Sequence, residues 1–123
     1  MATRALLYST ATNTATNVLS TLIIPGLIIQ GQRSNVCSKT ISYTVASTDD
    51  IILCNNATSM TITLPVASAT GHVVQVKNIN ATGSVIVDAN VNGGTIDSEI
   101  IQTVSSWENM SIIDGASLKW YIL

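Results

Sequence analysis

The sequence predicts an all-β protein: an antiparallel β-sandwich or a small, jelly-roll-like barrel, with an extended N-terminal arm. Ile, Val, Thr and Ser are abundant and Phe is absent, and β-branched residues favour pleated strands over helices. From Val36 onward, short segments alternate apolar and polar residues, with Gly, Asn, Asp and Pro between them, as expected of strands and hairpins. A chain of 123 residues can form one domain with its own core.

The predicted strands follow one another at the short spacing of a sandwich or barrel. Asp114 and Gly115 are expected to form a two-residue hairpin turn, because such turns require positive φ angles. Trp120 alternates with polar neighbours and is expected to pack inward, and Trp107 is expected in the core rather than exposed as a platform for sugars. The predicted strands are 41–45, 51–54, 60–64, 72–78, 84–88, 95–97, 100–104, 107–113 and 118–123.

The first 35 residues differ from the rest and are predicted to form an anchoring and oligomerisation arm (1–35) before a β-sandwich domain (36–123). Their apolar stretch, 18–29, is interrupted by Pro25 and Gly26, which predicts two short strands flanking a turn. The stretch is too short and broken to span a membrane, and the N-terminus lacks the pattern of a secretory signal. Exposed, it would promote aggregation. It is therefore either a core strand of the same domain or, as we favour, an intersubunit or anchoring strand.

The charged residues and the cysteines limit the classes of partner and binding site that the sequence predicts. The chain has five Lys and Arg and seven Asp and Glu, for a net charge of −2, and its scattered basic residues predict no nucleic-acid binding. So little charge indicates either a surface of Ser and Thr hydroxyls or, as we favour, a surface covered by partner subunits. Cys37 and Cys54 form no CxxC pair, and with a single histidine they predict no zinc site. They are expected as buried free thiols rather than a disulfide.

No residue pattern predicts an active site, a cofactor or a metal, so the chain is not expected to be an enzyme. His72 is the only histidine and is expected at the surface, at a strand edge. The pair Asp97 and Glu99 is spaced as glycosidase carboxylates on one strand face could be, although an acidic turn flank is commoner. Asp49 and Asp50 could contribute to a calcium site but lack the spacing of a calcium loop, so they are expected as an ordinary polar turn. Residues 92–94, Asn-Gly-Gly, lack the context of a phosphate loop and are expected as a turn.

Residues 39–123 carry an ordered series of short motifs that resembles a small β-domain found at the ends of bacteriophage tail fibres, head fibres and related virion appendages. Ser98 departs from the Gly expected after Ile96-Asp97, and the first 35 residues resemble nothing that we can name. The motifs are Tyr43-Thr44-Val45, Asp49-Asp50, Thr61-Ile62-Thr63-Leu64-Pro65, Gly71, Val76-Lys77-Asn78, Gly83, Val85-Ile86-Val87, Ile96-Asp97, Trp107-Glu108 and Asp114-Gly115 before Trp120-Tyr121-Ile122.

The resemblance implies a homotrimeric surface knob or short fibre, assembled in the host cytoplasm and carried on the particle surface. Between head and tail we favour a capsid decoration or head fibre, because a chain of this length has room for an anchor and a knob but not for a shaft. Its partners would be two further copies and other virion proteins, of the capsid or tail, contacted through the arm. A tail fibre or a module that binds a host surface glycan is the alternative. A hydrolase of host polysaccharide is disfavoured, because such fibres resemble long repetitive β-helices and no repeat is visible here.

Overall fold

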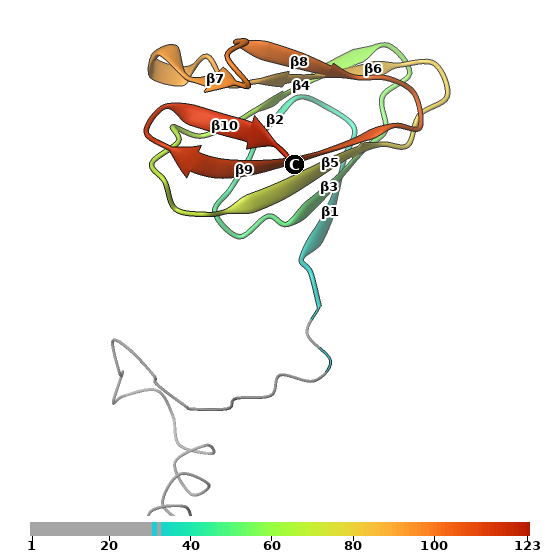
Figure 1. Cartoon of the computed structure of the whole chain (residues 1–123). Helices are drawn as coiled ribbons and strands as arrows, with labels where there is room; N and C mark the ends of the chain where they lie inside the picture. Colours follow the sequence, from blue (N-terminus) through green and yellow to red (C-terminus); the bar gives the residue numbers. More distant parts are fainter. Residues whose placement is uncertain (1–30, 32) are drawn as a thin grey trace, which may run out of the picture. The chain divides into compact units, whose positions relative to one another are not determined.

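Two β-sheets face each other in the computed structural model, which describes residue 31 and residues 33–123 (Figure 1). The described part contains no α-helix, and its one helical element is the 3-10 turn η1, Val91–Gly93. This confirms the predicted all-β class. The predicted arm, with its turn at Pro25 and Gly26, lies outside the described residues except at its C-terminal end.

The larger sheet, sheet A, has six strands in the order β1-β3-β5-β9-β10-β7, and sheet B has four in the order β2-β4-β6-β8. Every predicted segment contains or overlaps one observed strand, and the predicted 51–54 and 84–88 coincide with β3 and β6. The strands are β1 (Val36–Lys39), β2 (Tyr43–Thr44), β3 (Ile51–Cys54), β4 (Ser59–Thr63), β5 (Val73–Asn78), β6 (Ser84–Asp88), β7 (Thr95–Ile96), β8 (Ile101–Val104), β9 (Asn109–Ala116) and β10 (Lys119–Ile122).

The predicted antiparallel arrangement is wrong, because most neighbouring strands are parallel. The pairs β1–β3, β3–β5, β2–β4, β4–β6 and β10–β7 are parallel, and only β10–β9, β5–β9 and β6–β8 are antiparallel. From β1 to β9 the chain changes sheet after every strand. Up to β6, each strand that returns to the same sheet after two crossings runs parallel to the previous strand of that sheet, whereas β6 and β8 run antiparallel. The sandwich therefore consists of two mixed sheets, and a jelly roll, which is antiparallel, is not formed by the described residues.

The core lies between the sheets and follows the alternation that the sequence displays. In β3, β5 and β6 every second residue is buried, with the intervening residues partly exposed. Stacked sheets place their inward side chains in one layer about 10 Å thick. The large apolar residues of this layer are Ile52, Met60, Ile62, Val74, Val76, Val85, Val87, Ile96, Val104, Ile112 and Trp120.

The predicted hairpin turn at Asp114 and Gly115 is also wrong. Both residues lie within β9, and the turn to β10 is made by Ser117 and Leu118, with Leu118 at φ 60°. Gly115 is needed for a close approach instead: a Cβ there would lie 2.6 Å from the Tyr121 ring. Asp114 is buried and accepts hydrogen bonds, so an inward carboxylate, rather than a turn, is what this position requires.

The two tryptophans have opposite environments. Trp120 is 1% exposed and donates from Nε1 to the carbonyl oxygen of Pro65, at 3.2 Å, as predicted for a core residue. Trp107 is 60% exposed, so its predicted core position is wrong. It lies in the connection between β8 and β9, where the chain crosses from one sheet to the other and has no inward face to offer.

Candidate functional site

The His72 side chain holds two connecting segments of the chain together in this structure. The residue is half-buried rather than at the surface as predicted. Its Nε2 lies 2.7 Å from the carbonyl oxygen of Asp49, and its ring meets the Trp120 ring edge-on at 6.5 Å between centroids. No Ser or Cys side chain is hydrogen-bonded to it among the described residues. This arrangement joins the loop before β3 to the start of β5.

Asp49 and Asp50 hold the chain around the β2–β3 connection. Asp49 accepts hydrogen bonds from the Tyr43 hydroxyl and the Ala46 N–H, both at 2.8 Å, while Asp50 accepts one from the Asn35 N–H at 2.6 Å. Burial acts to raise the pKa of Asp49, but the hydrogen bonds from Ala46, Tyr43 and Cys37 outweigh it and hold the pKa below its usual value. The charged carboxylate is thus a structural acceptor, as in a polar turn.

Asp114 is a buried acceptor that the sequence analysis assigned to a turn. Its two carboxylate oxygens accept hydrogen bonds from the backbone N–H groups of Ser68, Ala69 and Thr70 and from the Thr70 hydroxyl, at 2.6–3.2 Å. Burial acts to raise the pKa of Asp114, yet these donors lower it below its usual value. The carboxylate pins the β4–β5 connection to β9. No sequence signal distinguishes such a residue from a turn aspartate.

Asp97 and Glu99 do not share a strand face. β7 ends at Ile96, and Asp97 and Ser98 have φ angles of 49° and 75° in a tight turn. Asp97 accepts a hydrogen bond from the Ile122 N–H at 3.2 Å, and Glu99 is exposed. The pair is therefore the flank of a turn. Gly adopts the positive φ of Ser98 without strain, which agrees with the expectation of Gly at this position.

The other candidates give no metal or phosphate site within residues 33–123. No group of three or more His, Cys, Asp and Glu residues could hold a metal ion there. Asn92 and Gly93 belong to the turn η1, as predicted. Cys37 and Cys54 are free thiols on neighbouring strands, and burial raises the pKa of Cys54 to about 11. No helix in the described part is long and apolar enough to cross a membrane.

The outer side of sheet A carries an apolar face. Val73 and Tyr121 both pair with Ile113, so these three side chains lie side by side across β5, β9 and β10. Gln75, Lys77 and Ser111 separate them from a second group on β1 and β3. Four members are between 40% and 69% exposed. The apolar face consists of Val36, Ile51, Leu53, Val73, Ile113, Tyr121 and Leu123.

The outer side of sheet B carries a hydroxyl face in the corresponding position. Thr61 and Thr103 flank Ile86 in one cross-strand row, and Thr44 and Thr63 lead into another. Such side chains satisfy the packing of a pleated surface while their hydroxyls remain in water. The hydroxyl face consists of Thr44, Ser59, Thr61, Thr63, Ser84, Ile86, Asp88, Ile101 and Thr103.

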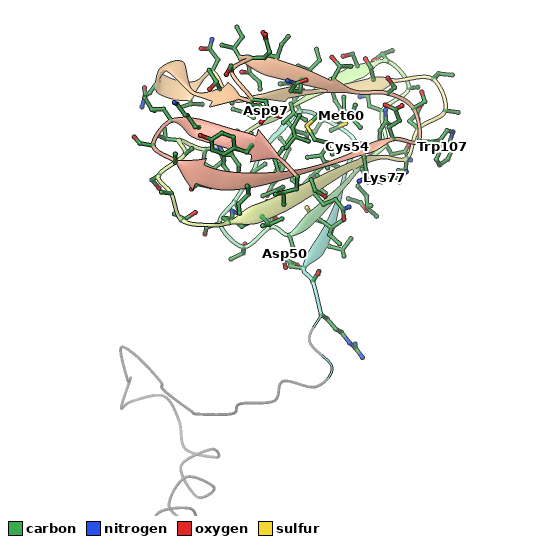
Figure 2. The ribbon with its side chains drawn as sticks, viewed as in Figure 1. Asp50, Cys54, Met60, Lys77, Asp97 and Trp107 are labelled. Carbon is green, nitrogen blue, oxygen red and sulfur yellow. The ribbon has the colours of Figure 1, made fainter. Side chains whose placement is uncertain are left out.

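Trp107 projects from a tight turn at one end of the sandwich (Figure 2). The Glu108 N–H donates to the Ser105 carbonyl oxygen at 3.1 Å, which makes Trp107 the third residue of a four-residue turn. Its φ is 65°, a conformation that turns normally give to Gly or Asn. Holding a bulky residue there costs about 1–3 kcal/mol. The sequence could have revealed the turn through Ser105-Ser106, but not the exposure.

Comparison with known proteins adds no relative: no family model, no curated protein and no solved structure matches this chain. The candidate features are therefore those that the structure itself provides, namely the apolar face of sheet A and the Trp107 turn.

Proposed function

We propose that this chain is a structural protein of a bacteriophage particle, a homotrimeric surface knob or short fibre that decorates the capsid as a head fibre. The phage assignment rests on the motif series of residues 39–123. The apolar face of sheet A is the observation that supports the proposed assembly into trimers. An isolated subunit would leave Val73 and Tyr121 in water, and burying apolar side chains of this size stabilises an assembly by up to about 1.5–3 kcal/mol each.

Three copies related by a cyclic axis would bury these faces against one another. Cyclic symmetry closes the assembly, so every copy is covered and no free face remains to propagate aggregation. The low charge of the chain, with only 10% charged residues, agrees with a surface that is partly covered. The arm, residues 1–35, would join the interface or attach the knob to other virion proteins.

Light scattering on the purified full-length protein tests the assembly. We expect three times the subunit mass of 12.9 kDa, at all concentrations above the dissociation constant. A soluble monomer at high concentration would remove the trimer from the proposal.

The copy number in purified particles tests the location. A number comparable with that of the capsid subunit supports capsid decoration, whereas a few copies would indicate a tail fibre. Deleting residues 1–35 should leave the protein free of the particle.

The proposal includes no catalytic activity, which His72→Ala tests. We expect unchanged infectivity and a loss of about 1 kcal/mol in the free energy of unfolding, because the variant loses one hydrogen bond to a backbone carbonyl. Loss of infectivity in a variant that folds and assembles normally would indicate an unrecognised active site.

A further inference from the structure

Trp107 occupies a position that backbone geometry would give to glycine. Its φ of 65° is a left-handed conformation that is unfavourable for any bulky side chain. Glycine would adopt it without strain, and nothing in the fold requires an indole here, because the side chain is 60% exposed. A strained position that carries a large exposed aromatic residue points to a use outside the fold itself.

The turn beneath Trp107 is firmly fixed. The Lys77 ammonium group donates a hydrogen bond to the Trp107 carbonyl oxygen, and the Ser106 hydroxyl donates to the carbonyl oxygen of Gly83 at 3.3 Å. The Asn78 N–H donates to the Glu108 carbonyl oxygen at 3.0 Å. These contacts join the turn to β5 and to the β5–β6 connection. The indole is therefore presented on a rigid base, which lowers the entropy lost on binding.

The surroundings of the indole are polar. Ser105, Glu108 and Asn109 adjoin it in the chain and are exposed, and Asn109 pairs with Lys77 on the neighbouring strand. A single aromatic side chain among hydrogen-bonding groups differs from the contiguous apolar core of a protein–protein interface. The row of Val73, Ile113 and Tyr121 on sheet A has that contiguous character, whereas this end of the sandwich combines one flat apolar surface with charged and amide groups.

We infer that the Trp107 turn is a saccharide-binding site. A pyranose ring presents C–H groups on one face, which can stack on the indole, and hydroxyls around its rim, which Lys77, Glu108 and Asn109 can reach as donors and acceptors. One such platform offers a monosaccharide only a small contact area and therefore binds it weakly. A homotrimer would present three of them, so binding to a dense glycan surface gains by avidity, typically about a hundredfold or more.

This inference goes beyond the proposed structural role and does not depend on it. If the protein is monomeric and binds sugars, the trimer is refuted and the saccharide-binding site stands. If it is trimeric and binds no sugar, the site is refuted and the trimer stands.

The test follows tryptophan fluorescence of the full-length protein during titration with glucose, galactose and N-acetylglucosamine. Because the chain has two tryptophans and Trp120 is buried, iodide quenches the exposed Trp107 selectively. We expect at least one sugar to shift the emission and to protect it from iodide. The protein should also be retained on beads that carry that sugar. If no sugar changes the emission and no bead retains the protein, the inference is wrong.

Trp107→Gly separates function from folding. Glycine suits the turn, so we expect the thermal unfolding midpoint to stay the same or rise, while retention on the beads falls roughly tenfold or more. Trp107→Phe should keep part of the binding. Leu118→Gly is the matched control, since Leu118 is a second exposed apolar residue with a φ of 60°, and it should bind sugar normally.

Two outcomes of these variants would overturn the inference. A lower unfolding midpoint in Trp107→Gly would make the indole a structural residue. A change in its oligomeric mass would place Trp107 in a subunit interface.

Discussion

The two outer faces of the sandwich are built from the same alternating strands but differ in chemistry. On sheet B the outward positions are mainly Ser and Thr, with Thr61, Ile86 and Thr103 forming a typical row. On sheet A the corresponding row is Val73, Ile113 and Tyr121. The hydroxyl face can remain in water, whereas the apolar face exposes the kind of surface that soluble monomers usually cover.

The difference indicates that composition must be interpreted face by face. Averaged over the chain, abundant Thr and low charge fit both a hydroxyl-coated monomer and a covered subunit. The register separates the two explanations, because it places most outward hydroxyls on sheet B and most outward aliphatic residues on sheet A. Sheet B fits the first explanation, and sheet A has the apolar surface that the proposed assembly would cover.

The strongest test of the comparison introduces charge on each face. Val73→Asp with Tyr121→Asp should abolish the proposed trimer, because a buried unpaired carboxylate costs several kcal/mol at an interface. The control, Thr61→Asp with Thr103→Asp, should leave the oligomeric mass unchanged. Analytical ultracentrifugation measures both. If only the control variant failed to assemble, the subunit interface would lie on the hydroxyl face of sheet B and not on the apolar face of sheet A.

A second test compares a carboxylate in each sheet. Asp114→Ala removes the acceptor of four hydrogen bonds in sheet A and should lower the free energy of unfolding by about 3 kcal/mol, because the donors of residues 68–70 lose a buried partner. Asp88→Ala on the hydroxyl face loses one exposed bond to the Asn90 N–H and should change stability by less than about 0.5 kcal/mol. Urea unfolding measures both values. Equal losses would contradict the structural role of Asp114.

The pH dependence of stability should arise from Asp49 and Asp114. Hydrogen bonding holds the pKa of each carboxyl below its value in the unfolded chain, so the unfolded state binds protons more readily in acid. This stabilisation is complete above the unfolded pKa of about 3.9 and is lost as pH falls through the lower folded pKa values. Urea midpoints measured down that range should decrease, and Asp114→Asn should reduce the slope. A midpoint that is constant with pH would contradict the assignment.

The smallest expected effect comes from converting the hydroxyl face into an apolar one. Thr61→Val with Thr103→Val keeps the β-branched shape and should change the free energy of unfolding by less than about 0.5 kcal/mol. The new apolar row should nevertheless promote association at high concentration, which light scattering detects. If the variant stays dispersed as the wild type does, exposed aliphatic residues alone do not drive assembly, and the argument from the apolar face weakens.

Several elements follow from the sequence because their signals are local. The alternation of residues 60–64 and 84–88 placed β4 and β6 and the buried Met60, Ile62 and Val85. Trp120 was predicted inside by the same parity. The loop candidates at Asp49 and Asn92 were predicted as turns. In each case burial of one face of a pleated strand, or the backbone preference of a turn residue, acts within a few positions of the chain.

Four features could be established only from the tertiary structure. They are the direction of the strands, the position of the last hairpin turn, the burial of Asp114 and the exposure of Trp107. An alternating segment has the same pattern in a hairpin and in a chain that crosses between sheets. The sequence by itself therefore determined where most strands lie, although not β1, and it did not determine that most strands pair in parallel. The Asp114 carboxylate accepts hydrogen bonds from backbone N–H groups of a loop that lies 44 to 46 residues away in the sequence. Trp107 is exposed because it lies where the chain passes from β8 to β9. Such positions depend on contacts between distant segments, and only the packed sandwich decides them.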